Sequence, residues 1–190
     1  MTDRILEQLI KLQIINSEEE EIYRFGLEAL FLKGVHYISY FFIAILGCEV
    51  PKFILFFVAF LLLRKSAGGY HSETKAGCYI LSCLTVISVI FLLKHIVLHN
   101  VMTMIAILFL VTADVIIYFL APLGNRNREL DIEETKYFRK RTILVLVSEN
   151  FFASLFVGIH KEQYALSLIL AIICQAILLI LQKRKDVNDK

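Results

Sequence analysis

Long apolar runs without charge are the feature that most limits what this chain of 190 residues can form. The chain is 58% hydrophobic, and its charged residues gather between the apolar runs. A run of about 18 or more apolar residues is typical of a helix that crosses a bilayer. Such a helix satisfies all of its backbone groups internally. We therefore predict an all-α polytopic membrane helix bundle, with residues 1–190 as a single membrane domain.

Six apolar runs are candidate transmembrane spans. The second is the shortest, because only eleven uninterrupted apolar residues, 53–63, follow Pro51 and Lys52. It must gain length from its neighbours or be partly re-entrant. Before the first span, residues 1–16 place apolar and charged side chains on opposite faces, which predicts an amphipathic helix on the inner membrane surface. The candidate spans are residues 27–47, 51–65, 77–93, 96–120, 142–159 and 164–181.

The distribution of Lys and Arg predicts the orientation. Counted in the segments that separate the long stretches free of Lys and Arg, their numbers alternate as 4, 1, 3, 1, 6, 1 and 4. Cytoplasmic segments of membrane proteins carry the excess of basic residues. Both termini are therefore expected in the cytoplasm. The regular alternation also favours six full crossings over a re-entrant second segment.

The connection between the second and third spans contains His71 and Cys78. A nucleophilic cysteine needs thiolate character and a base. Cys78 is expected to open a helix, where unpaired N–H groups favour the thiolate. Seven residues of continuous helix would separate the pair by ~10 Å, so the chain must fold back, with freedom supplied by Gly68 and Gly69. On chemistry alone, an ordinary loop with a chance histidine is an equal alternative.

The other cysteines give no sign of a metal site or a disulfide framework. Cys83 and Cys174 lie inside apolar spans, where cysteine usually acts as a small hydrophobic side chain. No spacing matches a zinc site. We expect no metal, no cofactor and no nucleic-acid partner.

Arg64, Gly69, His71 and Cys78 form the pattern R-x-x-x-G-G-x-H-x-x-x-x-x-x-C. This pattern resembles the signature of the accessory gene regulator B (AgrB) endopeptidases, small bacterial membrane proteins with a cytoplasm-facing His/Cys pair. Residues 121–128, followed by the basic stretch 136–141, are similar to that family's A-P-x-x-x-x-N-[KR] loop. Together with length and hydropathy, the resemblance extends over most of the chain.

The resemblance implies a membrane cysteine endopeptidase that matures a signal peptide for quorum sensing. Cys78 would attack a propeptide of the AgrD type near its C-terminal end, with His71 as the general base. A cysteine or serine of the propeptide would then displace the enzyme and close a thiolactone or lactone ring. The expected location is the bacterial cell membrane, with the active site on the cytoplasmic side.

Further residues are candidates for binding. Arg64, Gly68 and Gly69 would contact substrate or the oxyanion, although Arg64 has an equal reading as a positive-inside anchor. Six basic residues between the fourth and fifth spans would attract an acidic propeptide tail or anionic membrane lipid, or would only hold the loop inside. These six are Arg126, Arg128, Lys136, Arg139, Lys140 and Arg141. The sequence leaves the oligomeric state open, with a homodimer among the alternatives.

Asp114 and Glu149 support a rival hypothesis. Each acid lies within an apolar span, where ionised carboxylates cost ~2.5–3.5 kcal/mol by insertion scales. A small transporter or a lipid-head-group enzyme would use them as a proton or ion relay. Against this, the chain shows no internal repeat of the kind that transporters often have.

Overall fold

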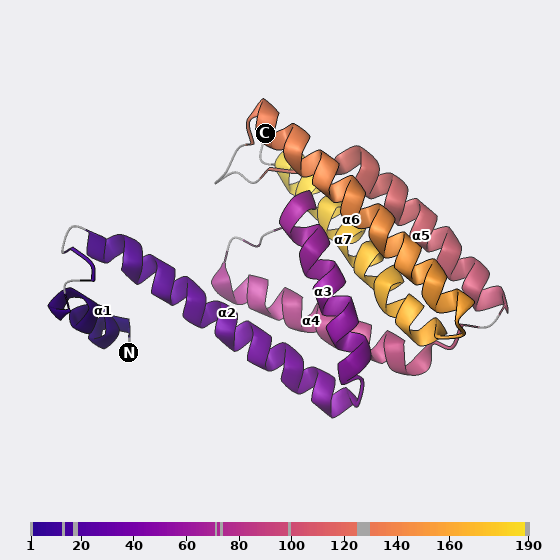
Figure 1. Cartoon of the computed structure of the whole chain (residues 1–190), viewed down its shortest axis with the longest axis horizontal. Coiled ribbons are helices and arrows are strands. Elements are labelled where there is room, and N and C mark those ends of the chain that lie inside the picture. The colour runs from indigo at the N-terminus through magenta and orange to yellow at the C-terminus, as the bar shows by residue number, and fades with distance from the viewer. Residues whose placement is uncertain are drawn as a thin grey trace. The chain divides into compact units, whose positions relative to one another are not determined.

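The computed structural model describes residues 2–12, 14–16, 19–70, 72, 74–98, 100–124 and 130–188. In this part of the chain the regular structure consists of seven helices, which confirms the predicted all-α class (Figure 1). The helices are α1 (Thr2–Lys11), α2 (Glu20–Gly47), α3 (Val50–Ala67), α4 (Lys75–His95), α5 (Asn100–Leu120), α6 (Ile132–Gly158) and α7 (Glu162–Asn188).

Five of the described helices, α2, α4, α5, α6 and α7, are long and apolar enough to cross a membrane. Large apolar side chains remain exposed on them, and on α5 Met104 and Leu108 are 72% and 67% exposed. Water-soluble proteins rarely leave so much contiguous apolar surface uncovered. Lipid is the solvent that such a surface suits. The protein is therefore a multi-pass membrane protein.

The predicted span 51–65 forms α3, which is not among those five helices. Its 18 residues rise by ~27 Å, slightly less than the ~30 Å thickness of the hydrocarbon layer. Lys52 lies near its start and Arg64 and Lys65 near its end, so only its middle is uncharged. A sixth crossing by α3 stays a prediction.

Several helices begin or end beyond the predicted spans. The clearest case is α6, which starts at Ile132 and not at residue 142. Asp131 caps it, because its Oδ1 accepts the Glu134 N–H at 2.7 Å. Hydropathy detects only the part of a helix that meets lipid, whereas the helix itself begins at its polar cap. The basic stretch 136–141, expected in a loop, is thus helical.

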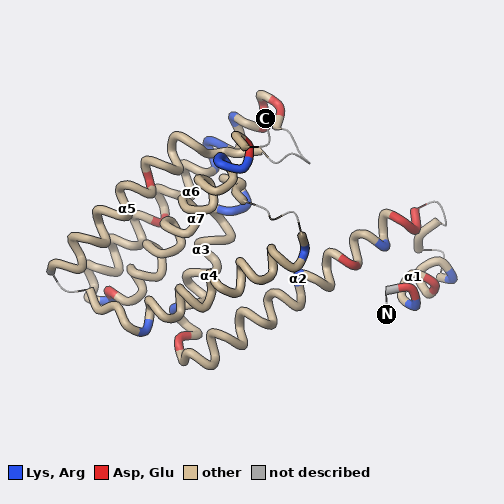
Figure 2. The backbone as a smooth tube through the Cα atoms, turned by 180° about the vertical axis from the view of Figure 1, so that it is seen from behind, with Lys and Arg blue, Asp and Glu red and all other residues tan. Residues whose placement is uncertain are grey.

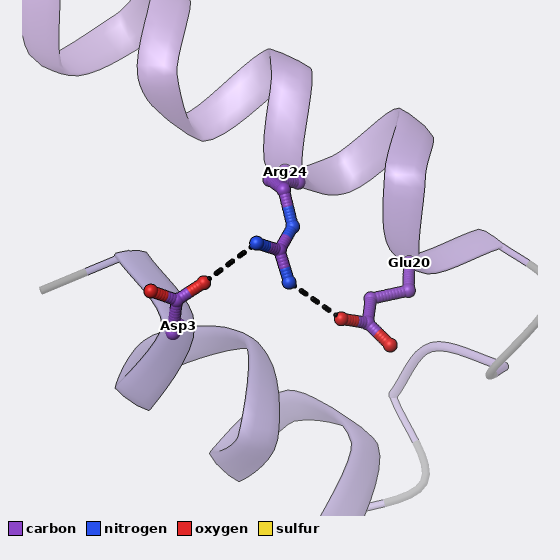
Figure 3. A network of polar contacts seen from close by, with 3 residues as sticks. All are labelled: Asp3, Glu20 and Arg24. Atoms are coloured by element: carbon purple, nitrogen blue, oxygen red, sulfur yellow. Dashed lines mark hydrogen bonds and ion pairs between the residues drawn. The ribbon is translucent and has the colours of Figure 1, made fainter.

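The chain divides into two compact units, Met1–Ile43 and Ala44–Lys190. In the first unit, the predicted amphipathic segment forms α1 and buries Leu6 and Ile15. Arg24 of α2 bridges Asp3 of α1 and Glu20, with both N···O distances at 2.8 Å (Figure 3). Exposed ion pairs of this kind contribute little to stability, because water screens them. Binding of α1 to the membrane surface stays a prediction.

In the second unit α7 is the central helix. It packs against α3, α5 and α6, and all of its side chains from Ala165 to Ile172 are buried (Figure 1). This position explains why the sequence of α7 is apolar all round, since no side faces water. The core joins residues from α3, α5, α6 and α7: Leu63, Ala67, Ala113, Ile117, Ala121, Leu146, Ile172, Ala176 and Leu179.

Lys and Arg residues gather at one end of this unit, where α3 ends, α6 begins and α7 ends (Figure 2). The ring of Tyr118, in the last turn of α5, also lies at this end, 5.6 Å from the guanidinium carbon of Arg139 on α6. The turn that follows α3 lies at this cationic end.

Candidate active site

The chain turns sharply after α3, at Gly68 and Gly69. The Gly68 N–H donates to the Arg64 carbonyl at 3.2 Å, and the φ angles of the two glycines are +75° and +133°. Side chains other than that of glycine rarely adopt these angles. A Cβ on Gly68 would also strike the Leu123 carbonyl oxygen, and one on Gly69 would strike the Arg64 guanidinium. The expected glycine turn is confirmed, while contact of these glycines with substrate stays a prediction.

This turn joins the two segments that carry the sequence motifs. The Leu123 N–H donates to the Ala67 carbonyl at 3.0 Å, and Gly68 pairs with Leu123 in an isolated parallel bridge. Leu123 follows the Ala121–Pro122 peptide bond, which is cis. Backbone pairing therefore fixes the end of α3 against the connection that leaves α5.

Arg64 folds back over the turn. Its Nη1 donates to the Gly68 carbonyl at 3.3 Å, and its Nη2 donates to the Tyr70 carbonyl. These bonds account for two of the five N–H donors of the guanidinium. Arg64 thus has a role that the sequence did not suggest, as a clamp on the turn.

The central helix α7 is also hydrogen-bonded to this turn. Gln175, which is fully buried, donates from Nε2 to the Gly68 carbonyl at 2.8 Å. The Tyr70 N–H donates to the Leu178 carbonyl at 3.1 Å, and Lys185 Nζ lies 5.8 Å from the centre of the Tyr70 ring. Sequence reasoning missed Gln175. The available signal was a single amide within an apolar span, where polar side chains often bond a neighbouring element.

Cys78 lies in the first turn of α4, but it does not open the helix. Thr74 is the N-cap, and its Oγ1 accepts the Gly77 N–H at 3.0 Å. The Cys78 N–H is bonded to the Thr74 carbonyl at 3.1 Å, so the N–H of Cys78 itself is not among the unpaired groups at the start of the helix. The polar cap adds helical residues that hydropathy did not detect. The thiol of Cys78 is half-buried.

The segment before α4 folds back over the start of that helix. A Cβ on Gly77 would lie 2.5 Å from Ser72 Oγ and 2.8 Å from Thr74 Oγ1, so glycine is needed for this close approach. The predicted reversal of the chain before Cys78 is thus present at Ser72. His71 itself lies outside the described residues, as do Arg126 and Arg128.

The described basic candidates lie on the first turns of α6. Lys136, Arg139 and Lys140 are exposed and Arg141 is half-buried. Arg139 lies over the Tyr118 ring of α5, as noted above. Exposed cations on a helix that enters the membrane can act on charged partners at the surface.

The intramembrane acids have different surroundings. Asp114 of α5 accepts a hydrogen bond through Oδ1 from Asn150 Nδ2 of α6 at 3.1 Å. Asp114 and Asn150 help to line a mostly apolar groove of about 520 Å³. Glu149 is 4% exposed, and neither of its carboxylate oxygens has a hydrogen-bond partner among the described residues. Asp114 is therefore hydrogen-bonded to a neighbouring helix. The Glu149 carboxylate, in contrast, is buried without a hydrogen bond to any described residue.

A model of the family Accessory gene regulator B (AgrB) matches residues 2–179. The chain belongs to the AgrB family. Two relatives from Clostridium perfringens are similar to it. "Putative AgrB-like protein" of strain SM101 (type A) is 26% identical over 167 residues, which cover 86% of this chain and 78% of that protein. "Putative AgrB-like protein 2" of strain 13 (type A) is 25% identical over 137 residues, covering 70% of this chain and 64% of the relative. No solved structure matches the chain.

Membership in the AgrB family confirms the resemblance inferred from the sequence. The matched region includes the turn, the start of α4 and most of α7. In this AgrB-family chain, Arg64, Leu123 and Gln175 thus reach Gly68 from three different elements.

Proposed function

We propose that this protein is a membrane-embedded cysteine endopeptidase that cleaves the C-terminal part of an AgrD-type propeptide. The observation that carries the proposal is the junction of Gly68 with Leu123, which joins the two AgrB-type motifs at the end of α3. The turn between Arg64 and Cys78 is held by the Arg64 and Gln175 side chains and by backbone bonds. Catalytic groups need such fixed positions to react efficiently.

In the proposed reaction Cys78 is the nucleophile and His71 the general base. The proton of the Cys78 thiol passes to His71, and Sγ adds to the scissile carbonyl carbon. The C–N bond then breaks as the leaving amine takes this proton, and the acyl group remains on Cys78 as a thioester. The Arg64 side chain holds the turn that leads to Cys78 through the Gly68 and Tyr70 carbonyls.

The second half of the reaction closes a ring. A thiol or hydroxyl of the propeptide adds to the thioester carbonyl, and the C–S bond to Cys78 breaks. The proton lost by the attacking group returns to the Cys78 thiolate. A thiolactone or a lactone results, and thioester exchange of this kind is nearly balanced in energy. The apolar helices around the site would limit hydrolysis of the intermediate.

We also propose that both termini and the active site face the cytoplasm. The cationic end of Ala44–Lys190 lies where α3 and α7 end and α6 begins (Figure 2). Positive residues concentrate on the cytoplasmic side of membrane proteins. Alkylation of single added cysteines in intact cells and in open membranes would test this orientation.

The test of the peptidase proposal compares two cysteines of α4. Cys78→Ala should abolish cleavage of a co-expressed AgrD-type propeptide, while membrane insertion continues. Cys83→Ala is the matched control, because both thiols are half-buried on the same helix. A gel that separates intact and cleaved propeptide gives the result. Cleavage by the Cys78→Ala protein would exclude this residue as the nucleophile.

The role of His71 has a separate test. His71→Ala should lose turnover, yet its Cys78 should still react with iodoacetamide at raised pH. If the wild-type thiol of Cys78 reacts no faster than that of Cys83 at any pH, activation of Cys78 is refuted.

A second candidate function is a proton or ion relay through Asp114 and Glu149. It is favoured by the buried Glu149 carboxyl, which has no partner among the described residues. In lipid such a group is costly to leave ionised and unpaired. Glu149→Gln distinguishes the two functions, because a peptidase keeps its cleavage rate and a relay loses transport. A protein that transports after Cys78→Ala but not after Glu149→Gln would establish the second function.

A further inference from the structure

A groove of about 530 Å³ lies at the cationic end of the bundle, between the ends of α5 and α7. Leu120, the last residue of α5, forms one wall. The α7 wall consists of Ile180, Lys183, Arg184, Val187 and Asn188. Their spacing of three and four residues places them on one face of the helix. The groove thus follows the last two turns of α7.

The groove changes from apolar to cationic along its length. Ile180 lies near the end of the apolar part of α7, and Lys183 and Arg184 follow one turn later. One turn of helix corresponds to ~5 Å. A phospholipid is complementary to this groove, because its apolar acyl chains lead to an anionic phosphate. Basic side chains at this depth attract anionic lipid head groups.

The two cations have no competing partner in the described structure. Neither Lys183 nor Arg184 forms an ion pair or hydrogen bond with a described residue, and both side chains are exposed. The neighbouring carboxylate, Asp186, accepts a bond from Gln182 Nε2 at 2.8 Å instead. The groove therefore offers positive charge that the described residues leave uncompensated.

We propose that this groove binds an anionic phospholipid, with the phosphate at Lys183 and Arg184 and an acyl chain along Leu120 and Ile180. A lipid fits better than an acidic peptide, because a peptide would place backbone polar groups against this apolar wall. The cationic part of the groove lies beyond residue 179, where the family match ends. The proposal does not depend on the peptidase activity.

The chain allows a direct test, because it contains no tryptophan. Ile180→Trp places a single indole in the groove at a half-buried side chain, one turn before the two cations. Phosphatidylglycerol with brominated acyl chains should quench this indole on the order of tenfold more effectively than brominated phosphatidylcholine. Lys183→Gln together with Arg184→Gln should remove this preference.

The control is Lys140→Gln with Arg141→Gln, which removes the same charge from α6 at the same end of the bundle. It should keep the preference. Equal quenching by both lipids, or equal loss in the control, would refute a specific site. Relief of quenching by a soluble acidic peptide would assign the groove to a peptide and also overturn the proposal.

A second measurement avoids the added tryptophan. Native mass spectrometry of the full-length protein in detergent should retain bound phosphatidylglycerol, and the Lys183→Gln/Arg184→Gln protein should lose it. Retention by both proteins would contradict the proposed phosphate site. Neither experiment uses a propeptide, so its failure would leave the proposed peptidase function untouched.

Discussion

Replacement of Gln175 by leucine should displace the turn at Gly68 and Gly69 while changing the stability of the protein only slightly. Gln175 is fully buried in α7 and donates to the Gly68 carbonyl at 2.8 Å. Leucine has a similar size and suits the apolar surroundings, but it cannot donate. The substitution therefore removes one anchor of the turn without opening a large cavity.

The expected loss of stability is small. Side-chain hydrogen bonds between membrane helices contribute ~0.6 kcal/mol on average. The Gly68 carbonyl keeps its bond from Arg64 Nη1 at 3.3 Å, and the Gln175 Oε1 that disappears has no partner among the described residues. The free energy of unfolding should thus change by less than ~1 kcal/mol. Catalysis is more sensitive, because a misplacement of ~1 Å can cost about a hundredfold in rate.

The assay is cleavage of an AgrD-type propeptide in proteoliposomes, with kcat and KM measured separately. We expect Gln175→Leu to lower kcat at least tenfold and leave KM nearly unchanged. Gln182→Leu is the matched control, because Gln182 is also buried on α7 but bonds Asp186 within the same helix. Full activity of Gln175→Leu, or an equal loss in Gln182→Leu, would refute the role of Gln175 as an anchor.

Three further predictions concern the same end of the bundle. Gly68→Ala should destabilise the protein by about 1–3 kcal/mol and abolish cleavage, whereas Gly34→Ala, which has no atom within 4 Å of its Cβ, should be tolerated; thermal unfolding and the cleavage gel report both. Arg64→Lys keeps the positive charge but cannot clamp two carbonyls, so normal insertion with at least tenfold lower cleavage is expected, and full activity would favour a pure topological anchor. Neutralising the described basic residues of α6 together should raise KM without lowering kcat, and the defect should shrink at high salt; a salt-independent fall in kcat would instead mean that they position catalytic groups. The residues to neutralise are Lys136, Arg139, Lys140 and Arg141.

Sequence patterns predicted those parts of the site that depend on local chemistry. The need for the chain to reverse before Cys78 pointed to Gly68 and Gly69, and both have positive φ angles. The anchor at Gln175 could not be predicted, because its partner is a carbonyl 107 residues away and any carbonyl can accept such a bond. Similarly, the clamp formed by Arg64 depends on where Tyr70 lies after the turn.

The helices show the same difference between features set by local sequence and features set by contacts between distant residues. Hydropathy located the apolar part of each long helix, since burial in lipid requires it. It placed the start of α6 too late and that of α4 slightly late, because Asp131 and Thr74 act as caps outside the apolar part. It also gave no indication that α7 is the central helix, because lipid and protein neighbours select similarly apolar side chains.

The long-range bond between Gln175 and Gly68 has a consequence for synthesis. The ribosome completes the segment around Cys78 before it reaches α7, and translation from Gly68 to Gln175, 107 positions later, takes on the order of 5–20 s. During that interval the turn lacks both its Gln175 and Leu178 partners. The segment that carries Cys78 therefore lacks the hydrogen bonds from α7 until α7 has been inserted into the membrane. The hydrogen bonds that Gln175 and Leu178 make to this turn are thereby confined to chains in which α7 has been made.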